Sequence, residues 1–304
     1  VRIEEMQHGQ RLDNFLLRVL KGVPRSRVYR LIRRGEVRVN KKRSKPEQRL
    51  ERGDQVRIPP YAGPEQSQPG KPGEGLQELL FASVMHEDEA VLILNKPAGL
   101  AVHGGSGIRL GLIEALRQMR PDWRHLELAH RLDRDTSGCL VIAKNPIQLK
   151  PIQEQFKARD VEKHYLALVH GQWPEALAEI TVPLQRNELS GGERVVKVDP
   201  AGKPARTLFR VRQRFADATL LEVTPETGRT HQIRVHCQHA GHPIVGDARY
   251  VHSRHLGSNG HLNQTRTLCL HAWKIRFRHP ADGAALSAAA PLDRHFQQIL
   301  DSLQ

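Results

Sequence analysis

A stretch rich in proline and glycine divides this chain of 304 residues into two unequal parts. Residues 59–75 contain five Pro and four Gly among seventeen residues, with no periodic apolar pattern. Such a composition is typical of a linker, because it offers few side chains to bury and many backbone conformations. We therefore predict a small domain at residues 1–60, a linker at 61–78 and a larger domain at 79–304.

Most of the net charge of +14 lies in the small part of the chain. Residues 1–60 hold 17 basic and 7 acidic residues, which gives this fifth of the chain a net charge of +10. Concentrated positive charge is typical of proteins that bind a polyanion, because neutralised phosphates release their counterions. The alternatives are a solvated basic face or an anionic membrane surface. The second is the weaker, since no amphipathic helix with bulky apolar anchors accompanies the charge.

Several protein classes are excluded by composition. The longest apolar runs have five residues, whereas a transmembrane helix needs about twenty. Residues 1–10 are charged and lack the apolar region of a secretory signal. The three cysteines form no CxxC pair, so neither a disulfide framework nor a zinc ribbon is indicated. We expect a cytoplasmic protein, and a monomer, because no segment requires a partner chain.

The small part has the pattern of two helices followed by two strands. Apolar residues recur at helical spacing in the first helix and again in the second. These are Leu12, Phe15, Leu16, Val19 and Leu20 in the first, and Val28, Leu31 and Ile32 in the second. Residues 37–40 and 55–58 alternate like half-buried strands.

This arrangement resembles the S4 RNA-binding domain. The matching pieces are residues 9–13, 26–39 and 50–58. In that family the second helix and the loop after it lie against structured RNA, where they contact phosphates without reading sequence. The resemblance implies that these contacts are made by Arg27, Arg30, Arg33, Arg34, Lys41, Lys42 and Lys45.

The large part mixes strands and helices without a regular alternation. Residues 91–94 and 139–143 are short apolar runs bounded by polar turns, as in buried strands. Helices are expected at 111–119, 148–157 and 291–303. We therefore predict an α+β domain and not a doubly wound parallel sheet.

Four segments of the large part are unusual for pure scaffolding, and polar loops at the ends of rigid strands often carry reactive groups. They are residues 94–99 (LNKPAG), 130–138 (HRLDRDTSG), 163–169 (KHYLALV) and 226–236 (ETGRTHQIRVH).

The pair Asp133 and Asp135 is suited to general acid–base chemistry. Side chains two positions apart in extended backbone point the same way, so two carboxylates could share a site as in a glycosidase. Arg131 and Arg134 beside them favour the ionised form. The residues alone leave open a glycosidase pair, a single nucleophile or base, and a surface ion-pair network.

Five residues of types that bind zinc lie close together in the sequence. These are His231, His236, Cys237, His239 and His242. Their spacing fits neither HExxH nor a paired-cysteine ribbon, so we expect no metal site.

Taken together and in this order, the four segments resemble the RluA family of pseudouridine synthases, many of whose members carry an S4 domain in front. The resemblance covers nearly the whole chain. It implies a mixed, mainly antiparallel sheet in the catalytic domain. It also implies isomerisation of uridine to pseudouridine in 23S ribosomal RNA, with no metal or organic cofactor.

The resemblance further implies roles for individual residues. Asp133 matches the family's carboxylate, which attacks the nucleotide or abstracts a proton, whereas Asp135 does not match. Arg229 is expected to pair with Asp133 and hold it ionised. Tyr165 is expected to stack on the flipped base, and Arg131 to fill the space that the base leaves in the RNA. The alternatives are a non-catalytic ribosomal RNA-binding assembly factor and an RNA glycosidase.

Overall fold

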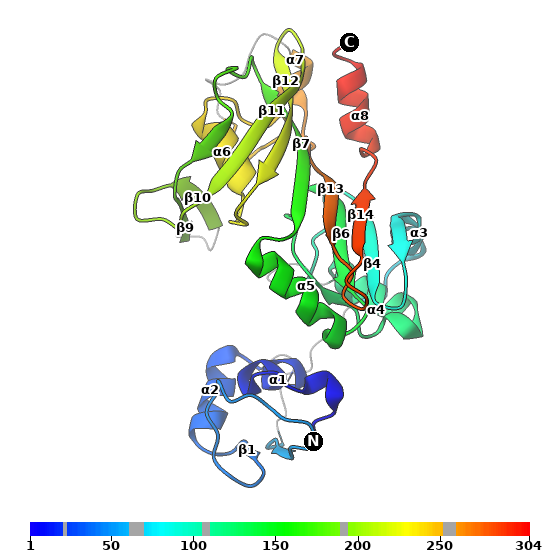
Figure 1. The fold of residues 1–304 in the computed structure, drawn as a ribbon, viewed down its shortest axis with the longest axis vertical. Coiled ribbons are helices and arrows are strands. Elements are labelled where there is room, and N and C mark those ends of the chain that lie inside the picture. The colour runs from blue at the N-terminus through cyan, green and yellow to red at the C-terminus, as the bar shows by residue number, and fades with distance from the viewer. Residues whose placement is uncertain (21–22, 61–69, 105–109, 189–193, 252–259) are drawn as a thin grey trace. The chain divides into compact units, whose positions relative to one another are not determined.

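The computed structural model describes residues 1–20, 23–60, 70–104, 110–188, 194–251 and 260–304 (Figure 1). Residues 61–69 of the predicted linker lie outside this range. Two compact units are present, the first formed mainly by Val1–Gly70 and the second mainly by Lys71–Gln304. No helix in the described parts is long and apolar enough to cross a membrane.

The first unit contains the two helices and two strands that the sequence predicts. They are α1 (Leu12–Val19), α2 (Arg25–Arg33), β1 (Arg38–Val39) and β2 (Val56–Arg57), preceded by a 3-10 turn at Glu5–Gln7. Strands β1 and β2 are antiparallel, with Val39 opposite Val56. The apolar faces of both helices form one core with the strands, because Leu12, Leu16 and Val28 are fully buried in it.

A buried carboxylate also ties this unit together. Asp13 at the start of α1 is only 1% exposed and accepts hydrogen bonds from the Arg11 guanidinium, at 2.8 and 3.1 Å. The Tyr29 hydroxyl on α2 donates to it at 2.8 Å. The bond from Arg11, with that from Tyr29, lowers the pKa of Asp13 to about 2. This network fixes α1 to α2 on the polar side of the core.

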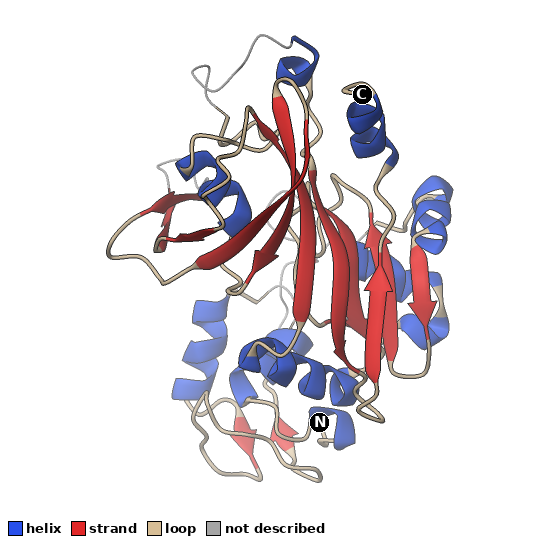
Figure 2. Ribbon diagram, turned by 45° about the horizontal axis from the view of Figure 1, so that its top comes forward, coloured by secondary structure: helices blue, strands red, loops and turns tan. Residues whose placement is uncertain are grey.

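The second unit is built on one large sheet (Figure 2). The strand order along it is β3-β4-β6-β13-β7-β12-β11-β8, with β14 paired to β13 and β5 to β6. Among the described strands only β13 and β6 are parallel neighbours, whereas the other pairs of this sheet are antiparallel. The predicted mixed, mainly antiparallel sheet is therefore confirmed.

The strands of the large sheet are β3 (Val84–Glu87), β4 (Val91–Lys96), β5 (Glu127–Leu128), β6 (Ser137–Ala143), β7 (Glu162–His170), β8 (Glu179–Thr181), β11 (Arg206–Arg214), β12 (Ala218–Pro225), β13 (Leu270–Arg278) and β14 (Ala285–Ala289). A separate hairpin is formed by β9 (Leu184–Glu188) and β10 (Arg194–Val198). The helices are α3 (Glu74–Ala82), α4 (Leu112–Met119), α5 (Pro146–Ala158), α6 (Gln232–His239), α7 (Gly260–Gln264) and α8 (Arg294–Asp301), with a 3-10 turn at Pro121–Trp123.

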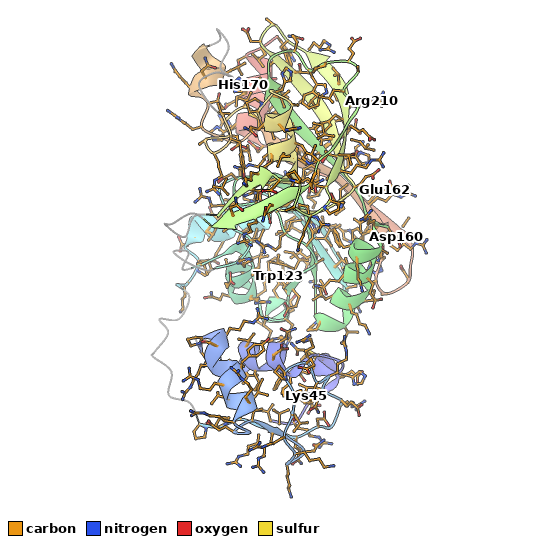
Figure 3. The ribbon with its side chains drawn as sticks, turned by 90° about the vertical axis from the view of Figure 1, so that its left-hand side faces the viewer. Lys45, Trp123, Asp160, Glu162, His170 and Arg210 are labelled. Atoms are coloured by element: carbon orange, nitrogen blue, oxygen red, sulfur yellow. The ribbon has the colours of Figure 1, made fainter. Side chains whose placement is uncertain are left out.

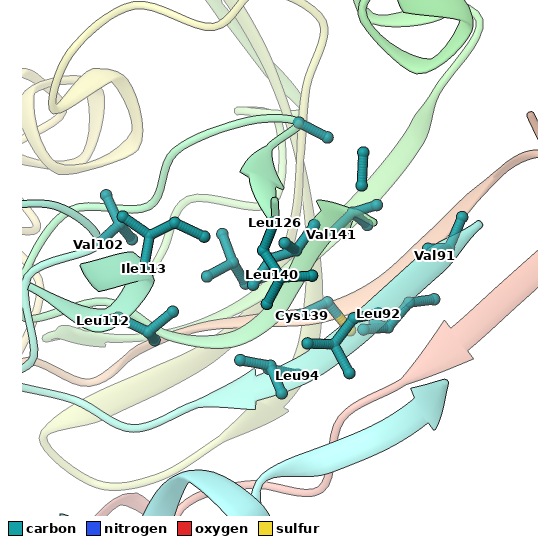
Figure 4. Packing of buried hydrophobic residues seen from close by; sticks show 14 of the residues in the cluster. Val91, Leu92, Leu94, Val102, Leu112, Ile113, Leu126, Cys139, Leu140 and Val141 are labelled. Carbon is teal, nitrogen blue, oxygen red and sulfur yellow. The ribbon is translucent and has the colours of Figure 1, made fainter. Parts of the chain in front are cut away.

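Two apolar clusters form the interior of this unit. One packs β4 and β6 against α4, with Leu92, Leu94, Leu140 and Val141 fully buried, as Figure 4 shows. The other packs β7, β12 and β13 against α6 and α8. Strands β4 and β6 are buried along most of their length, which explains why their sequences read as continuous apolar runs.

The predicted helices at 111–119, 148–157 and 291–303 correspond to α4, α5 and α8, with small shifts at their ends. The predicted linker ends too late, because α3 begins at Glu74. Leu76 and Leu80 lie on one face of α3 and pack on the first apolar cluster. Residues 74–78 are therefore helical and belong to the larger unit.

Candidate active site

The loop between β5 and β6 carries Asp133 and is fixed by hydrogen bonds of two side chains, Lys96 and His130. Lys96 at the end of β4 is fully buried, and its Nζ donates to the carbonyl oxygens of Pro97, Leu100 and Arg134 at 2.8–2.9 Å. Burial lowers the pKa of Lys96 to about 7, although Asp135 and Asp133 oppose this. His130 anchors the other side of the loop, since its Nε2 accepts the Val141 N–H at 3.0 Å.

The end of the HRLDRDTSG segment has a structural role. Gly138 has φ +105°, and a Cβ atom at this position would lie 2.3 Å from the carbonyl oxygen of Ala272 on β13. Glycine is therefore needed for β6 to approach β13. The buried Ser137 hydroxyl lies 2.8 Å from His271 Nδ1 and 2.9 Å from Asp293 Oδ2. These contacts fix the point at which the loop enters the sheet.

Asp133 lies at the mouth of this loop, with its side chain 30% exposed. Its Oδ2 is 3.5 Å from Arg234 Nη1 and 3.8 Å from His231 Nε2, and both partners come from the turn that starts α6. The two segments are about a hundred positions apart in the sequence, and the fold brings them together. The carboxylate thus has cationic and imidazole neighbours while it remains accessible.

Arg234 is fixed in place before it reaches Asp133. Its Nε and Nη2 contact the two carboxylate oxygens of the buried Asp247 at 2.7 and 2.8 Å, and the guanidinium lies 5.1 Å from the centre of the Tyr250 ring. A bidentate pair of this kind defines the guanidinium plane. The bond and charge of Asp247 outweigh burial and raise the pKa of Arg234.

The expectation that Arg229 pairs with Asp133 is wrong in this structure. Arg229 is exposed, and its Nε donates to the Pro204 carbonyl at 3.1 Å. The chain turns at residues 229–231 before α6 begins, and this turn directs Arg234 toward Asp133. An arginine between Ile233 and Val235 in a buried helix was the sequence signal that could have identified it.

Tyr165 on β7 lies in the same region and is largely enclosed. Burial raises the pKa of its hydroxyl, and the negative charge of Asp133 raises it further. The phenol therefore stays protonated at neutral pH. Tyr165 and Asp133 both line one cavity of about 790 Å³.

This cavity is bounded by the three segments that the sequence singled out around Asp133, Tyr165 and Arg229. Arg131 is exposed on its wall, and Ile233, Leu132 and Leu270 give it apolar surface. The lining on another side comes from α5, the turn after it and the start of β7, with Gln153, Phe156, Lys157, Arg159 and Lys163. The cavity therefore combines a carboxylate, an aromatic ring and a basic edge.

Asp135 does not line the cavity. It pairs instead with Arg134, whose Nε is 3.0 Å from its Oδ1, in an exposed contact. The glycosidase interpretation, which needs both carboxylates in one site, loses its geometric basis.

No group of three His, Cys, Asp or Glu residues able to hold a metal occurs within the described residues. The histidine run has other contacts, since His231 Nδ1 lies 2.7 Å from the Tyr250 hydroxyl and His242 Nδ1 lies 2.9 Å from the His170 carbonyl.

The first unit presents most of its predicted RNA-binding cations to solvent. The exposed ones are Arg30, Arg33, Arg34, Lys41, Lys42 and Lys45, the last labelled in Figure 3. Arg27 differs, because it is half-buried and its Nε is enclosed with no hydrogen-bond partner among the described residues. Arg27 is therefore the least suited of the seven to contact a phosphate.

Comparison with known proteins decides the family. The chain matches the family described as RNA pseudouridylate synthase over residues 90–239 and the S4 domain over residues 10–56. It is 50% identical over 303 residues to a protein named ribosomal large subunit pseudouridine synthase C from Pasteurella multocida, covering 99% of this chain and 93% of that protein. The chain belongs to the RluA family of pseudouridine synthases.

Further relatives agree with this assignment. The protein of the same name from Escherichia coli K12 is 49% identical over 310 residues, which covers 100% of this chain and 96% of that protein. Among solved structures, human RNA pseudouridylate synthase domain containing 4 has a TM-score of 0.62 and 28% identity, covering 75% of this chain and 95% of that one. The chain is thus an RNA pseudouridine synthase with an S4 domain.

Proposed function

We propose that this enzyme isomerises specific uridines to pseudouridine in 23S ribosomal RNA, with the Asp133 carboxylate acting on a flipped-out nucleotide. The observation that carries the proposal is Asp133 at the wall of the 790 Å³ cavity, 3.5 Å from an arginine that Asp247 already holds. The names of the relatives support the ribosomal large subunit as the source of the substrate.

The reaction conserves the atoms of the nucleotide. The N1–C1′ glycosidic bond breaks, the uracil turns, C5 bonds to C1′, C5 loses its proton, and N1 gains one in the product. Asp133 serves either by attacking the nucleotide or by abstracting a proton, and both roles need an ionised carboxylate aimed at the sugar. Arg234 Nη1, 3.5 Å from Oδ2, places a charged donor beside the carboxylate and helps to aim it.

Tyr165 and Arg131 serve the flipped base. The Tyr165 ring forms part of the cavity wall and offers a flat surface on which uracil stacks. Burial keeps its hydroxyl protonated, so it takes part in proton transfer from C5 by passing its own proton on as it accepts that one. Arg131 is exposed at the cavity and fills the gap that the base leaves, which offsets part of the few kcal/mol that unstacking costs.

The basic edge of the cavity suits the RNA backbone. Lys157 and Arg159 are exposed, and Lys163 is partly buried with its Nζ 6.0 Å from the centre of the Phe156 ring. We propose that these cations contact the phosphates that flank the target nucleotide. Such contacts set the position of the strand, whereas the cavity selects the base.

The direct test is to incubate the purified protein with unmodified 23S RNA, digest the RNA to nucleosides and separate the products. The proposal predicts that pseudouridine appears as uridine is lost in equal amount, with no free uracil. Free uracil would indicate a glycosidase, and an unchanged nucleoside profile with tight RNA binding would indicate a non-catalytic assembly factor. Either of these results contradicts the proposal.

A further inference from the structure

His231 has a backbone conformation that a histidine seldom adopts. Its φ is +53° and its ψ is 20°, in the left-handed region, immediately before α6 begins at Gln232. For a residue with a Cβ atom this region costs about 1–2 kcal/mol. Strain of this kind is concentrated at functional sites, where the surrounding structure maintains it. Here it accompanies a ring that lies between Tyr250 and Asp133.

The two ring nitrogens face different partners. Nδ1 is 2.7 Å from the Tyr250 hydroxyl oxygen, and the two rings meet edge to face with centroids 5.6 Å apart. Nε2 is on the side of Asp133, 3.8 Å from Oδ2. The His231 side chain is only 13% exposed, so bulk water has little access to either nitrogen.

Tyr250 determines which nitrogen carries the proton. Its hydroxyl oxygen already accepts the backbone N–H of Val196 on β10, at 3.2 Å. If the phenol O–H donates to Nδ1, every group in the chain of contacts is satisfied. If Nδ1–H donated instead, the O–H of this buried tyrosine would have no acceptor among the described residues, at a cost of about 1–3 kcal/mol. The first arrangement is therefore favoured.

We propose that His231 is a positioning residue for Asp133, held by Tyr250 as the neutral tautomer whose Nε2–H is aimed at the Asp133 carboxylate. The inference rests on the proposed function of Asp133. In the free enzyme the donor stands at 3.8 Å and Arg234 at 3.5 Å, and both approach when the nucleotide fills the cavity. Together they hold Oδ2 and leave Oδ1 for the substrate.

A neutral donor suits this position for an electrostatic reason. The charge of Arg234 is already balanced by its bidentate contact with Asp247. Arg234, Asp247 and Asp133 together therefore carry a net charge of −1. A neutral His231 orients the carboxylate without cancelling that charge. Burial lowers the pKa of His231, as do Arg234 and Arg249, while Asp133 and Asp247 oppose them.

The contacts that hold Tyr250 beside His231 extend to the β9–β10 hairpin. Val196 packs with Leu184, Ala205, Val235 and Tyr250 in one small apolar cluster, which joins the hairpin to α6. Tyr250 is thus fixed by packing and by the Val196 N–H.

Two variants of His231 test the contacts of Nδ1 and Nε2 separately. His231→Asn places an amide near the position of Nδ1, tolerates the left-handed backbone, and has no atom that reaches Asp133. His231→Gln places an N–H donor near the position of Nε2. We expect His231→Asn to lower the single-turnover rate of isomerisation by about 10- to 100-fold. We expect His231→Gln to retain most of the rate, and both to leave the dissociation constant for RNA within about twofold.

Nitrogen NMR of the histidine ring tests the tautomer without any activity. The wild-type enzyme is expected to show Nδ1 without a proton and Nε2 with one, and Tyr250→Phe to lose this preference. A proton on Nδ1 in the wild type would overturn the proposal, as would equal rates for His231→Asn and the wild type, or equally slow His231→Asn and His231→Gln. If the wild type itself makes no pseudouridine, the proposed function fails, while the ring spectrum still decides the tautomer.

Discussion

At the scale of single residues, Arg229 and Arg234 differ in burial and in the group that each contacts. Both belong to the same sequence motif, yet the side chain of Arg234 is 8% exposed and within 3.5 Å of Asp133, whereas Arg229 is exposed and bound to a backbone carbonyl. The spacing of the motif could not distinguish them. The direction of each side chain depends on the turn at residues 229–231, and that turn includes a left-handed histidine.

We predict that Arg234→Lys lowers the single-turnover rate by at least about 100-fold, because a point charge cannot keep both the bidentate contact to Asp247 and the approach to Asp133. Arg229→Lys is the matched control and is expected to change the rate much less. Thermal unfolding of both variants shows whether the fold persists. A larger loss in Arg229→Lys than in Arg234→Lys would contradict the assignment.

The stability of the enzyme should also depend on the protonation of His130. Burial, with the charge of Lys163, lowers the pKa of this imidazole to about 4. An unfolded histidine titrates near 6.5, so between these values the unfolded state binds more protons. The contribution is fully present above about pH 6.5. It is lost as the pH falls toward 4, by up to about 3 kcal/mol.

Urea unfolding at several pH values measures this effect. His130→Gln keeps an acceptor for the Val141 N–H but has no proton to bind, so its free energy of unfolding should fall less between pH 6.5 and 4. Identical pH profiles for the two proteins would show that His130 does not titrate in this way.

At the scale of elements, apolar periodicity predicted α1 and α2, because one face of each helix must be buried, and the helices α4, α5 and α8 were also expected from the sequence. The beginning of α3 was missed because the prolines and glycines of residues 59–75 dominate the local composition. The contact between the Asp133 loop and α6 was not predictable from the spacing of the motifs. The contact of Asp133 with α6 depends on where β6 and β7 stand in the sheet, and only the resemblance to a family indicated that the motifs share one site.

The junction of loop and strand at Gly138 gives a prediction at this scale. Gly138→Ala should destabilise the larger unit by several kcal/mol or prevent folding, because the added Cβ would meet the Ala272 carbonyl at 2.3 Å. Gly75→Ala in α3 is the control, since a Cβ there has open space and alanine favours helix by up to about 1 kcal/mol. Thermal unfolding compares the two, and equal stability of the variants would contradict the packing described here.

At the scale of the whole molecule, most of the predicted RNA-binding cations and the cavity lie in different units. The first unit supplies exposed cations on and after α2, whereas the second supplies the cavity. The sequence alone places most of the excess positive charge in residues 1–60, because this needs only residue counts. The exposure of each cation could be known only from the fold, because Arg27 lies on α2 with Arg30 and Arg33 but is half-buried.

We predict that replacing Arg30, Arg33 and Arg34 by Gln weakens RNA binding and reduces the slope of log K against log salt by up to about 2–3, while the unfolding temperature stays unchanged. The charge-matched control replaces Lys274, Arg276 and Arg278, which are exposed at alternate positions of β13. Fluorescence titrations at several salt concentrations give both slopes. An equal reduction in the control would show that α2 is not a preferred contact for RNA.

The central claim is that the carboxylate of Asp133 performs the isomerisation, and Asp133→Asn tests it most directly. This variant keeps the size of the side chain and removes its charge, with Asp135→Asn as the control outside the cavity. We predict that Asp133→Asn binds unmodified 23S RNA as tightly as the wild type but forms no pseudouridine in a single-turnover assay, while Asp135→Asn remains active. Pseudouridine formation by Asp133→Asn at the wild-type rate would contradict the account.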